Sequence, residues 1–443
     1  MSKLAINGGQ PVRTKLFPAY RTIGKEEKKA ASRVLDSGIL SRYLGSWDKD
    51  FYGGPEVQAF EKEWARYFGV KHAIAVNSCT SGLQCAVGAA GIGPGDEVIV
   101  SPYTMSASAT APLWYGAIPI FADIEPDYFC LDPKSVRARL TPRTKALIVV
   151  DIFGQPYDAT AINRLAKEHN LLVIEDCAQA PGATYRGKFA GTLADIGVYS
   201  LNYHKHIHTG EGGVVVTNND VLADRIRLIR NHAEAVVGDK GVTNLINMVG
   251  FNFRLTEIQA AIGREQLKKL KPLLTARVDN CRYVADKLAQ IPGITPAPVR
   301  SGATHAYYVQ PFLFDEHRVG ISRDLFIKAV KAELPSTKLR ELEGAQISVG
   351  YVKPLYLLPI FQKKAGFGKQ GYPFNLPSGK AAVYRKGMCP VVERMHEKEL
   401  FLHDMMHAHI KKSDLSDIIG AFTKVYKHRA ELKKTRTHLN NNG

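Results

Sequence analysis

The 443-residue sequence has no apolar run that approaches the roughly 20 residues needed to cross a bilayer. Its opening stretch, MSKLAINGGQPVRTK, contains no apolar core of signal-peptide length. We therefore expect a cytoplasmic protein without membrane-spanning segments.

Cysteine is scarce and scattered: the chain has six cysteines, and no two of them form a CxxC pair. This scatter predicts reduced thiols rather than a disulfide framework or a zinc site. Internal repeats and low-complexity segments are also missing.

Acidic residues are too few to balance the basic ones, so the formal net charge is +17. No RNP, helix-turn-helix or zinc-finger pattern accompanies the basic residues, which makes nucleic-acid binding a minor alternative. Part of the excess lies in residues 424–443, which we interpret as a solvated tail. The helix leading into it is predicted to begin at Ser413, ahead of an acidic first turn. A positive field is equally suited to an anionic small substrate.

Seven short β-rich runs alternate with helical stretches in the first half of the chain. They span residues 72–76, 96–101, 118–124, 145–154, 170–178, 196–202 and 212–218. Their continuous apolar character is what a sheet buried on both faces requires. The alternation predicts an α/β protein with a doubly wound sheet.

The pattern changes after a long helical stretch at residues 256–291, in which Pro272 predicts a kink or break. We expect a large domain with an N-terminal arm over residues 1–270. A smaller C-terminal α/β domain with the basic tail would cover residues 271–443.

Two segments carry candidate chemistry at the ends of predicted strands. In NSCTSG, Thr80 and Ser81 open a helix, where free N–H groups and the helix dipole form an anion site. Asp176 ends a buried strand and needs a cationic partner such as the protonated nitrogen of a pyridine cofactor. Taken singly, each residue is equally consistent with an ordinary helix cap.

The stretch HKHIH places Lys205 among His204, His206 and His208. In an extended strand the three imidazoles would share one face and could bind zinc or copper. Alternatively the lysine is the reactive group, which requires a pocket that favours its neutral amine. No acidic or cysteine ligand occurs at a recognisable spacing, so we predict no metal site.

An anion cradle, a buried acid and a lysine follow one another in the order typical of aspartate-aminotransferase-type enzymes, which use pyridoxal 5′-phosphate (PLP). SLNYHKHIHTGEGG resembles the S-F-x-x-x-K-N-x-x-x-G-E-G-G segment of the DegT/DnrJ/EryC1/StrS aminotransferases. GDEVIVSPYTMSASA, PRTKALIVVDIFGQPYD, VIEDCAQAPGA, GFNFRLTEIQAAIGREQL and VGYVKPLYLLPIF match the same family in order. The resemblance implies the PLP-dependent transferase fold type I, with a large mixed-sheet domain and a smaller α/β domain.

The resemblance also implies residue roles. Lys205 would bind PLP as a Schiff base and, once released, move a proton between the substrate Cα and the cofactor. Asp176 would pair with the pyridine nitrogen, and Gln179 would contact the ring hydroxyl. The cofactor phosphate would be held by hydroxyl and amide side chains, one of them from the second subunit of an obligate homodimer. These are Thr80, Ser81, Ser200 and, from the neighbouring subunit, Asn252.

Several positions depart from the family pattern. Met105 replaces the aromatic ring that usually stacks on the cofactor, although its polarizable sulfur can still pack there. Pro181 and Tyr356 stand where many members have histidine, the latter at a position that usually faces substrate. Asn202 and Tyr203 replace more usual residues beside the lysine.

The activity implied by the resemblance is transfer of an amino group from glutamate or glutamine to a keto-sugar, often nucleotide-linked, or to a keto-cyclitol. Two alternatives stay open: a PLP-dependent sugar dehydratase or lyase, and a non-catalytic PLP-binding regulator. The dehydratase branch has histidine in place of the lysine. Counting from Ser200 and back from TGEGG puts Lys205 in that position, which favours transamination.

Overall fold

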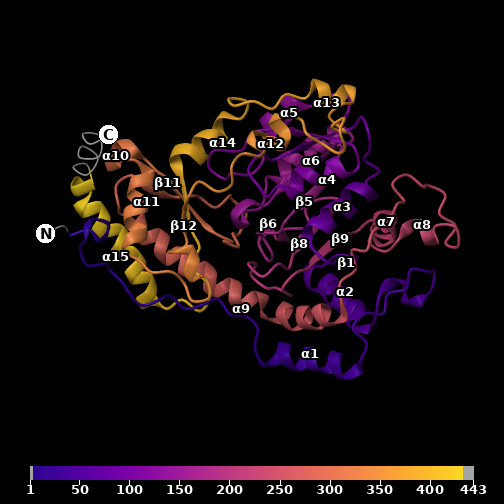
Figure 1. The fold of residues 1–443 in the computed structure, drawn as a ribbon, viewed down its shortest axis with the longest axis horizontal. Coiled ribbons are helices and arrows are strands. Elements are labelled where there is room, and N and C mark those ends of the chain that lie inside the picture. The colour runs from indigo at the N-terminus through magenta and orange to yellow at the C-terminus, as the bar shows by residue number, and fades with distance from the viewer. Residues whose placement is uncertain (1–2, 433–443) are drawn as a thin grey trace.

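The computed structural model describes residues 3–432, which form two lobes joined by one long helix (Figure 1). The larger lobe contains a seven-stranded sheet with strand order β1-β9-β8-β5-β4-β2-β3. Its strands are β1 (His72–Val76), β2 (Glu97–Val100), β3 (Ile118–Phe121), β4 (Thr144–Val150), β5 (Leu172–Asp176), β8 (Ile196–Ser200) and β9 (Gly213–Thr217). Strand β9 is antiparallel to both of its neighbours, and the other pairs are parallel. Each predicted β-rich run overlaps one of these strands, so the α/β prediction is confirmed.

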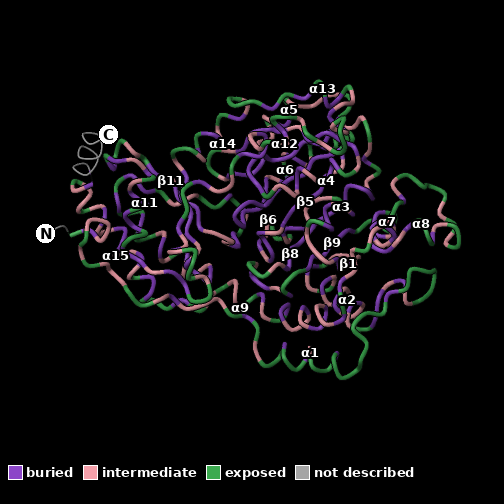
Figure 2. Tube along the Cα trace, viewed as in Figure 1, coloured by how far each residue is buried: buried purple, intermediate pink, exposed green. Residues whose placement is uncertain are grey.

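Helices cover both faces of this sheet, which explains the apolar strands. On one face, Ile74 and Val215 pack with α3 (Cys79–Ala89). On the other, Ala75 and Val214 pack with α2 (Pro55–Phe68). The remaining longer helices of this lobe are α1 (Lys25–Ser37), α4 (Ala107–Trp114), α5 (Pro133–Arg139), α6 (Ala159–Glu168) and α7 (Asp220–Arg230). Figure 2 shows the buried central strands in purple, whereas the outlying α1 is largely exposed.

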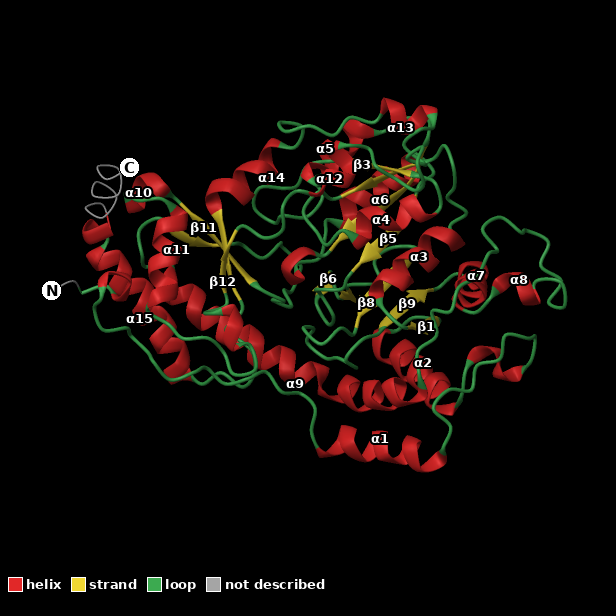
Figure 3. Ribbon diagram, in the orientation of Figure 1, coloured by secondary structure: helices red, strands yellow, loops and turns green. Residues whose placement is uncertain are grey.

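Helix α9 (Glu257–Leu288) runs from the larger lobe to the smaller one (Figure 3). Pro272 lies inside it, so the helix continues where a break had been a possible outcome of the sequence pattern. Before the proline, Leu270 is buried against the larger lobe, and after it Val284 is buried in the smaller lobe. Packing at both ends therefore compensates for the hydrogen bond that the proline removes.

The smaller lobe contains a four-stranded antiparallel sheet of order β10-β11-β13-β12. Its strands are β10 (Ile294–Pro296), β11 (Gln310–Phe314), β12 (Ile347–Val349) and β13 (Leu400–His403). Helices α11 (Arg323–Ala332) and α15 (Lys412–His428) contribute Phe326 and Phe422 to its core. Shorter elements are β6 (Thr184–Tyr185), β7 (Lys188–Phe189), α8 (Ala233–Val236), α10 (Glu316–Val319), α12 (Pro359–Gln362), α13 (Pro377–Ala381) and α14 (Pro390–Arg394).

The N-terminal segment packs on the smaller lobe, although the larger lobe follows it in sequence. Leu4 and Phe17 are fully buried in the core of the smaller lobe. The buried carboxylate of Glu333 accepts a hydrogen bond from the backbone N–H of Val12 at 3.1 Å and pairs with Lys424 at 2.6 Å. These contacts hold the N-terminal segment against helices α11 and α15.

A later segment of the chain, by contrast, packs on the larger lobe. Phe361, Tyr384 and Val392 lie after the first strands of the smaller lobe but are buried in the core of the large sheet. The two cores therefore draw on both ends of the sequence, and the division at residue 270 stays a prediction.

The C-terminal helix begins earlier than expected. Lys411 precedes its first residue, and the backbone N–H of Lys411 donates to Asp414 Oδ2 at 2.9 Å. Ser413 lies within the first turn, so its prediction as the cap is wrong. Residues 433–443 of the basic tail lie outside the described residues. Within residues 3–432, no helix combines the length and apolar character needed to cross a membrane.

Candidate active site

Lys205 lies in a loop of turns between β8 and β9, at the carboxyl edge of the large sheet. Its Nζ atom is 4.1 Å from the centroid of the Tyr308 ring, which comes from the chain just before β11. A cation over an aromatic face is stabilised by about 0.5–2 kcal/mol. The lysine is thus held against a residue about 100 positions away in the sequence.

Asp176 ends β5, which lies beside β8 in the sheet. It is 5% exposed and accepts hydrogen bonds from Ser108 Oγ at 2.7 Å and from the Ala178 N–H at 3.2 Å. The thiol of Cys79 is 3.9 Å from its Oδ1. No α-helix follows Asp176 within residues 177–183, so the interpretation as an ordinary helix cap is wrong.

The charges of this cluster affect one another. Burial lowers the pKa of Lys205 from its ordinary value, while Cys79 and Asp176 act to raise it. Burial raises the pKa of Asp176, and the hydrogen bond from Ser108 and the charge of Lys205 oppose that rise. A lysine with a lowered pKa is neutral more often, and only the neutral amine attacks a carbonyl.

The N-terminus of α3 lies at the same edge. Its cap is Ser78, whose Oγ accepts from the Ser81 N–H at 3.0 Å. The Ser81 hydroxyl donates to Asn77 Oδ1 at 2.5 Å, whereas Thr80 is exposed. A Cβ atom on Gly213 would come within 2.7 Å of the Ser78 backbone. Glycine at the start of β9 thus lets the helix terminus, with its N–H groups and dipole, lie against the sheet edge.

The remaining predicted cofactor contacts lie around this edge in differing environments. Gln179 is buried, accepts from the Phe153 N–H at 2.7 Å and donates to the Tyr351 hydroxyl at 3.1 Å. Ser200 is 7% exposed and ends β8. Met105 is 57% exposed, in the loop before α4.

Asn252 is exposed and lies beside the start of α3 in its own chain. Its carbonyl accepts from Asn77 Nδ2 at 3.4 Å, and its Oδ1 accepts from Arg254 Nε at 2.7 Å. Its predicted reach into the site of a neighbouring subunit stays a prediction.

The three histidines do not share a strand face. His204 is exposed, and its ring lies 3.7 Å from that of Tyr203. His206 is 1% exposed and its Nε2 is 2.8 Å from the Ala306 carbonyl. His208 is half-buried and accepts from the Gly210 N–H. The extended geometry behind the metal alternative is therefore wrong, and residues 3–432 contain no group of three His, Cys, Asp or Glu side chains placed to hold a metal.

The sequence did not reveal Cys79, Ser108 or Tyr308 as site residues. Cys79 stands inside the NSCTSG motif, and Ser108 follows PYTM, so both lie in segments already singled out. Tyr308 has no such local signal, because only the packing of the smaller lobe brings it to Lys205.

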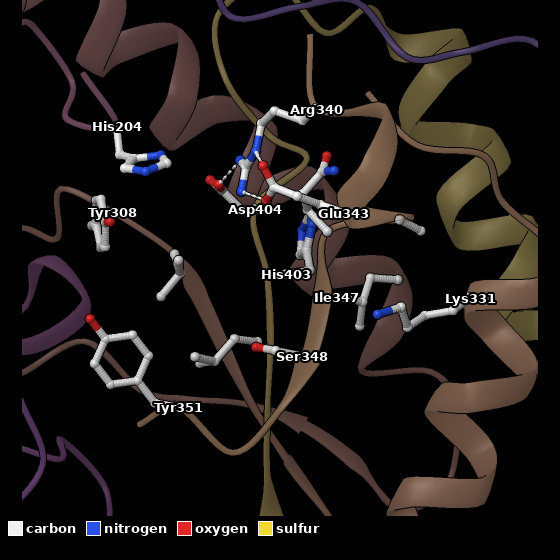
Figure 4. Close-up of a pocket in the computed structure, with 14 residues that line it drawn as sticks. His204, Tyr308, Lys331, Arg340, Glu343, Ile347, Ser348, Tyr351, His403 and Asp404 are labelled. Atoms are coloured by element: carbon white, nitrogen blue, oxygen red, sulfur yellow. Dashed lines mark hydrogen bonds and ion pairs between the residues drawn. The ribbon is translucent and has the colours of Figure 1, made fainter. Parts of the chain in front are cut away.

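A cavity of about 310 Å³ opens beside the lysine loop (Figure 4). His204 and Tyr308 line it on the side of the lysine loop. Arg340, Glu343 and Asp404 form a hydrogen-bonded group next to His204. A ligand in the cavity would contact the same tyrosine ring as the lysine.

Comparison with known proteins agrees with this arrangement. A model of the DegT/DnrJ/EryC1/StrS aminotransferase family matches residues 22–422, which is nearly the whole chain. The chain belongs to this family. The family is named for its PLP-dependent aminotransferases, so the predicted family and enzyme class are confirmed.

Relatives within the family include enzymes with different named substrates. The chain is 32% identical to an L-glutamine:2-deoxy-scyllo-inosose aminotransferase of Streptoalloteichus tenebrarius, over 97% of this chain and 99% of the relative. It is 42% identical to the GDP-perosamine synthase of Caulobacter vibrioides, over 63% and 74% of the two chains. The crystal structure of DesI, determined with its TDP-sugar product, matches with a TM-score of 0.79 and 28% identity, covering 98% of this chain and 99% of DesI. These matches confirm the fold type I prediction.

Tyr356 is one of the positions that depart from the family pattern, and its surroundings explain the departure. Tyr356 is fully buried in the core of the large sheet, where its hydroxyl donates to Glu393. In this family member the side chain therefore stabilises the packing of residues 355–395 on the larger lobe and does not line the cavity.

Proposed function

We propose that the protein transfers an amino group from glutamine or glutamate to a polyhydroxylated ketone, a keto-sugar or a keto-cyclitol, with PLP held at Lys205. The observation that carries the proposal is the placement of Lys205, with its lowered pKa, beside the buried carboxyl group of Asp176. The named relatives supply the donor and the two classes of acceptor.

The residues at this edge fit the cofactor. A buried carboxyl group with a raised pKa suits a protonated pyridine nitrogen, because that cation would offset the cost of burying the carboxylate. The N-terminus of α3, which Gly213 allows to approach the sheet, suits a phosphate. Thr80, Ser81 and Ser200 lie at the same edge and would add hydroxyl groups.

PLP, when bound, acts as an electron sink for the carbon that loses a proton. Lys205 would supply the amine that holds the cofactor and, when free, would take and return the proton at the substrate carbon. Asp176 would keep the pyridine nitrogen protonated, with Ser108 orienting the carboxylate. Gln179, fixed by Phe153, would present its amide to the ring hydroxyl.

We further propose a homodimer with shared sites, in which Asn252 reaches the phosphate bound by the other subunit. Its exposed position beside the start of α3 supports this role, because the side chain is available to a second copy. Size measurement in solution tests for the dimer. The shared site is tested by mixing Asn252→Ala and Lys205→Ala chains and measuring the activity of the mixture. Only complementation of activity in the mixed dimer supports a shared site.

The central experiment is reconstitution with PLP. Wild-type protein should turn yellow as the cofactor binds the lysine, and Lys205→Ala should not, whereas the exposed-lysine control Lys71→Ala should match wild type. With ¹⁵N-glutamine and a panel of nucleotide-linked keto-sugars and scyllo-inosose, mass spectrometry should detect labelled amino product. Turnover without nitrogen transfer would instead identify a dehydratase or lyase, and PLP binding without turnover a regulator.

A further inference from the structure

The cavity beside the lysine loop carries equal numbers of positive and negative side chains. Lys331 and Arg340 are its cations, and Glu343 and Asp404 are its anions. His204 is exposed at the edge of the cavity, and partial desolvation, followed by the charge of Arg340, lowers the pKa of its imidazole and favours the neutral form. The charged side chains that line the cavity therefore balance one another, although the whole chain is strongly basic.

The guanidinium of Arg340 is already occupied. Its Nε and Nη2 donate to the two carboxylate oxygens of Glu343 at 2.9 and 2.5 Å, and its Nη1 donates to Asp404 Oδ2 at 3.0 Å. A diphosphate would have either to exchange with a carboxylate or to use the N–H groups of Arg340 that remain free, where it would lie next to two anions. A hydroxyl group needs no such exchange, because each carboxylate oxygen keeps lone pairs that can accept further hydrogen bonds.

The size and walls of the cavity suit a compact ring. Its volume of about 310 Å³ is at the lower end of the roughly 300–1,000 Å³ typical of ligand pockets. Tyr308 and Tyr351 provide aromatic surface for the C–H groups of a ring, and Ser348 provides a further hydroxyl. Tyr308 also contacts Lys205, so a ring packed on this tyrosine lies next to the lysine loop, although Lys205 itself does not line the cavity.

We propose that this cavity is the acceptor subsite and that the Arg340–Glu343–Asp404 group selects an uncharged polyhydroxylated ring over a nucleotide-linked sugar. The proposal rests on the proposed aminotransferase function and narrows it to one acceptor class. It also gives His204 a place, as a neutral side chain at the edge of the acceptor subsite.

Binding of two probes that carry no ketone tests the selection. PLP-loaded wild-type protein is titrated with myo-inositol and with GDP-mannose, and binding is measured by saturation-transfer NMR and calorimetry. Myo-inositol should bind more tightly than GDP-mannose. Glu343→Gln keeps the shape of the side chain but removes the negative charge that pairs with Arg340. It should raise the affinity for GDP-mannose about fivefold, the upper range for an exposed ion pair, and lower that for myo-inositol.

Glu341→Gln is the matched control, because Glu341 is exposed on the same short turn but does not line the cavity. It removes the same charge from the chain and should change neither affinity. Tighter binding of GDP-mannose than of myo-inositol to wild type, or equal effects of the two substitutions, would overturn the proposal. PLP binding at Lys205 and ¹⁵N transfer are measured separately on the same wild-type protein, so a failure of the aminotransferase function is recognised independently.

Discussion

Asp151 and Glu175 form a buried carboxyl pair directly behind Asp176. Both are fully buried; Glu175 lies on β5, and Asp151 directly follows the neighbouring strand β4. Glu175 accepts from the Gly191 N–H at 2.7 Å, whereas Asp151 Oδ2 has no hydrogen-bond partner among residues 3–432. Burial raises the pKa of Glu175 from 4.5 to about 7, and burial with the nearby charge of Glu175 raises that of Asp151 well above its ordinary value.

Raised carboxyl pKa values mean that the folded protein binds more protons than the unfolded chain. The stability from the protonated pair is therefore complete below the unfolded pKa of about 4.5, and it is lost as the pH rises through about 7. For Glu175 alone, a shift of about 2.5 units corresponds to about 3 kcal/mol of unfolding free energy. Asp151→Asn should remove the part of this pH dependence that comes from Asp151 itself, since an amide does not titrate, can still accept from Tyr157 N–H and can donate to Glu175.

The assay is urea unfolding of wild type and Asp151→Asn at pH 5, 6, 7 and 8, followed by circular dichroism. The variant should gain stability relative to wild type with increasing pH, by up to about 1.4 kcal/mol per pH unit while the folded protein keeps Asp151 protonated. Asp127→Asn, at an exposed carboxyl group, is the control and should parallel wild type. If the Asp151→Asn curve also stays parallel to wild type from pH 5 to pH 8, the reasoning about a shared buried proton is refuted.

Other substitutions test the packing around the site. Arg230→Met should cost about 3–5 kcal/mol of unfolding free energy, because it leaves Glu61 without the fully buried arginine that it contacts at 2.6 Å. Adding Glu61→Gln should recover part of this free energy in the same urea assay. Tyr308→Ala should shift the pH at which the PLP–lysine absorbance titrates, whereas Tyr308→Phe, which keeps the ring face under Lys205, should leave it near wild type. Gly213→Ala should weaken PLP binding measured by equilibrium dialysis at least tenfold, because its Cβ forces the start of α3 away from the sheet edge; unchanged affinity would contradict the proposed phosphate cradle.

The parts of the fold that depend on local pattern could be predicted from the sequence. Each strand of the large sheet is a continuous apolar run, and burial on both faces makes such runs recognisable. The position of Asp176 followed from the same logic, because the carboxyl ends of parallel strands meet at one edge.

The contacts that depend on distant segments could not be predicted. Tyr308 reaches Lys205 only because the smaller lobe folds against the larger, and no spacing in the sequence encodes that contact. The three histidines alternate as in a strand, yet turns send each of them into a different environment. Pro272 predicted an interruption that packing at both ends of α9 overrides.

The attachment of the N-terminal segment to the smaller lobe has a consequence for synthesis of the protein. Leu4 and Phe17 leave the ribosome long before α15, but the core that buries them includes residues from that helix. At about 5–20 residues per second, the segment waits tens of seconds for its partners. Tyr20, next to this segment, donates a hydrogen bond at 2.5 Å to the carbonyl of His206, the neighbour of Lys205. We therefore expect the reactive lysine to reach its final position only after α15 has left the ribosome.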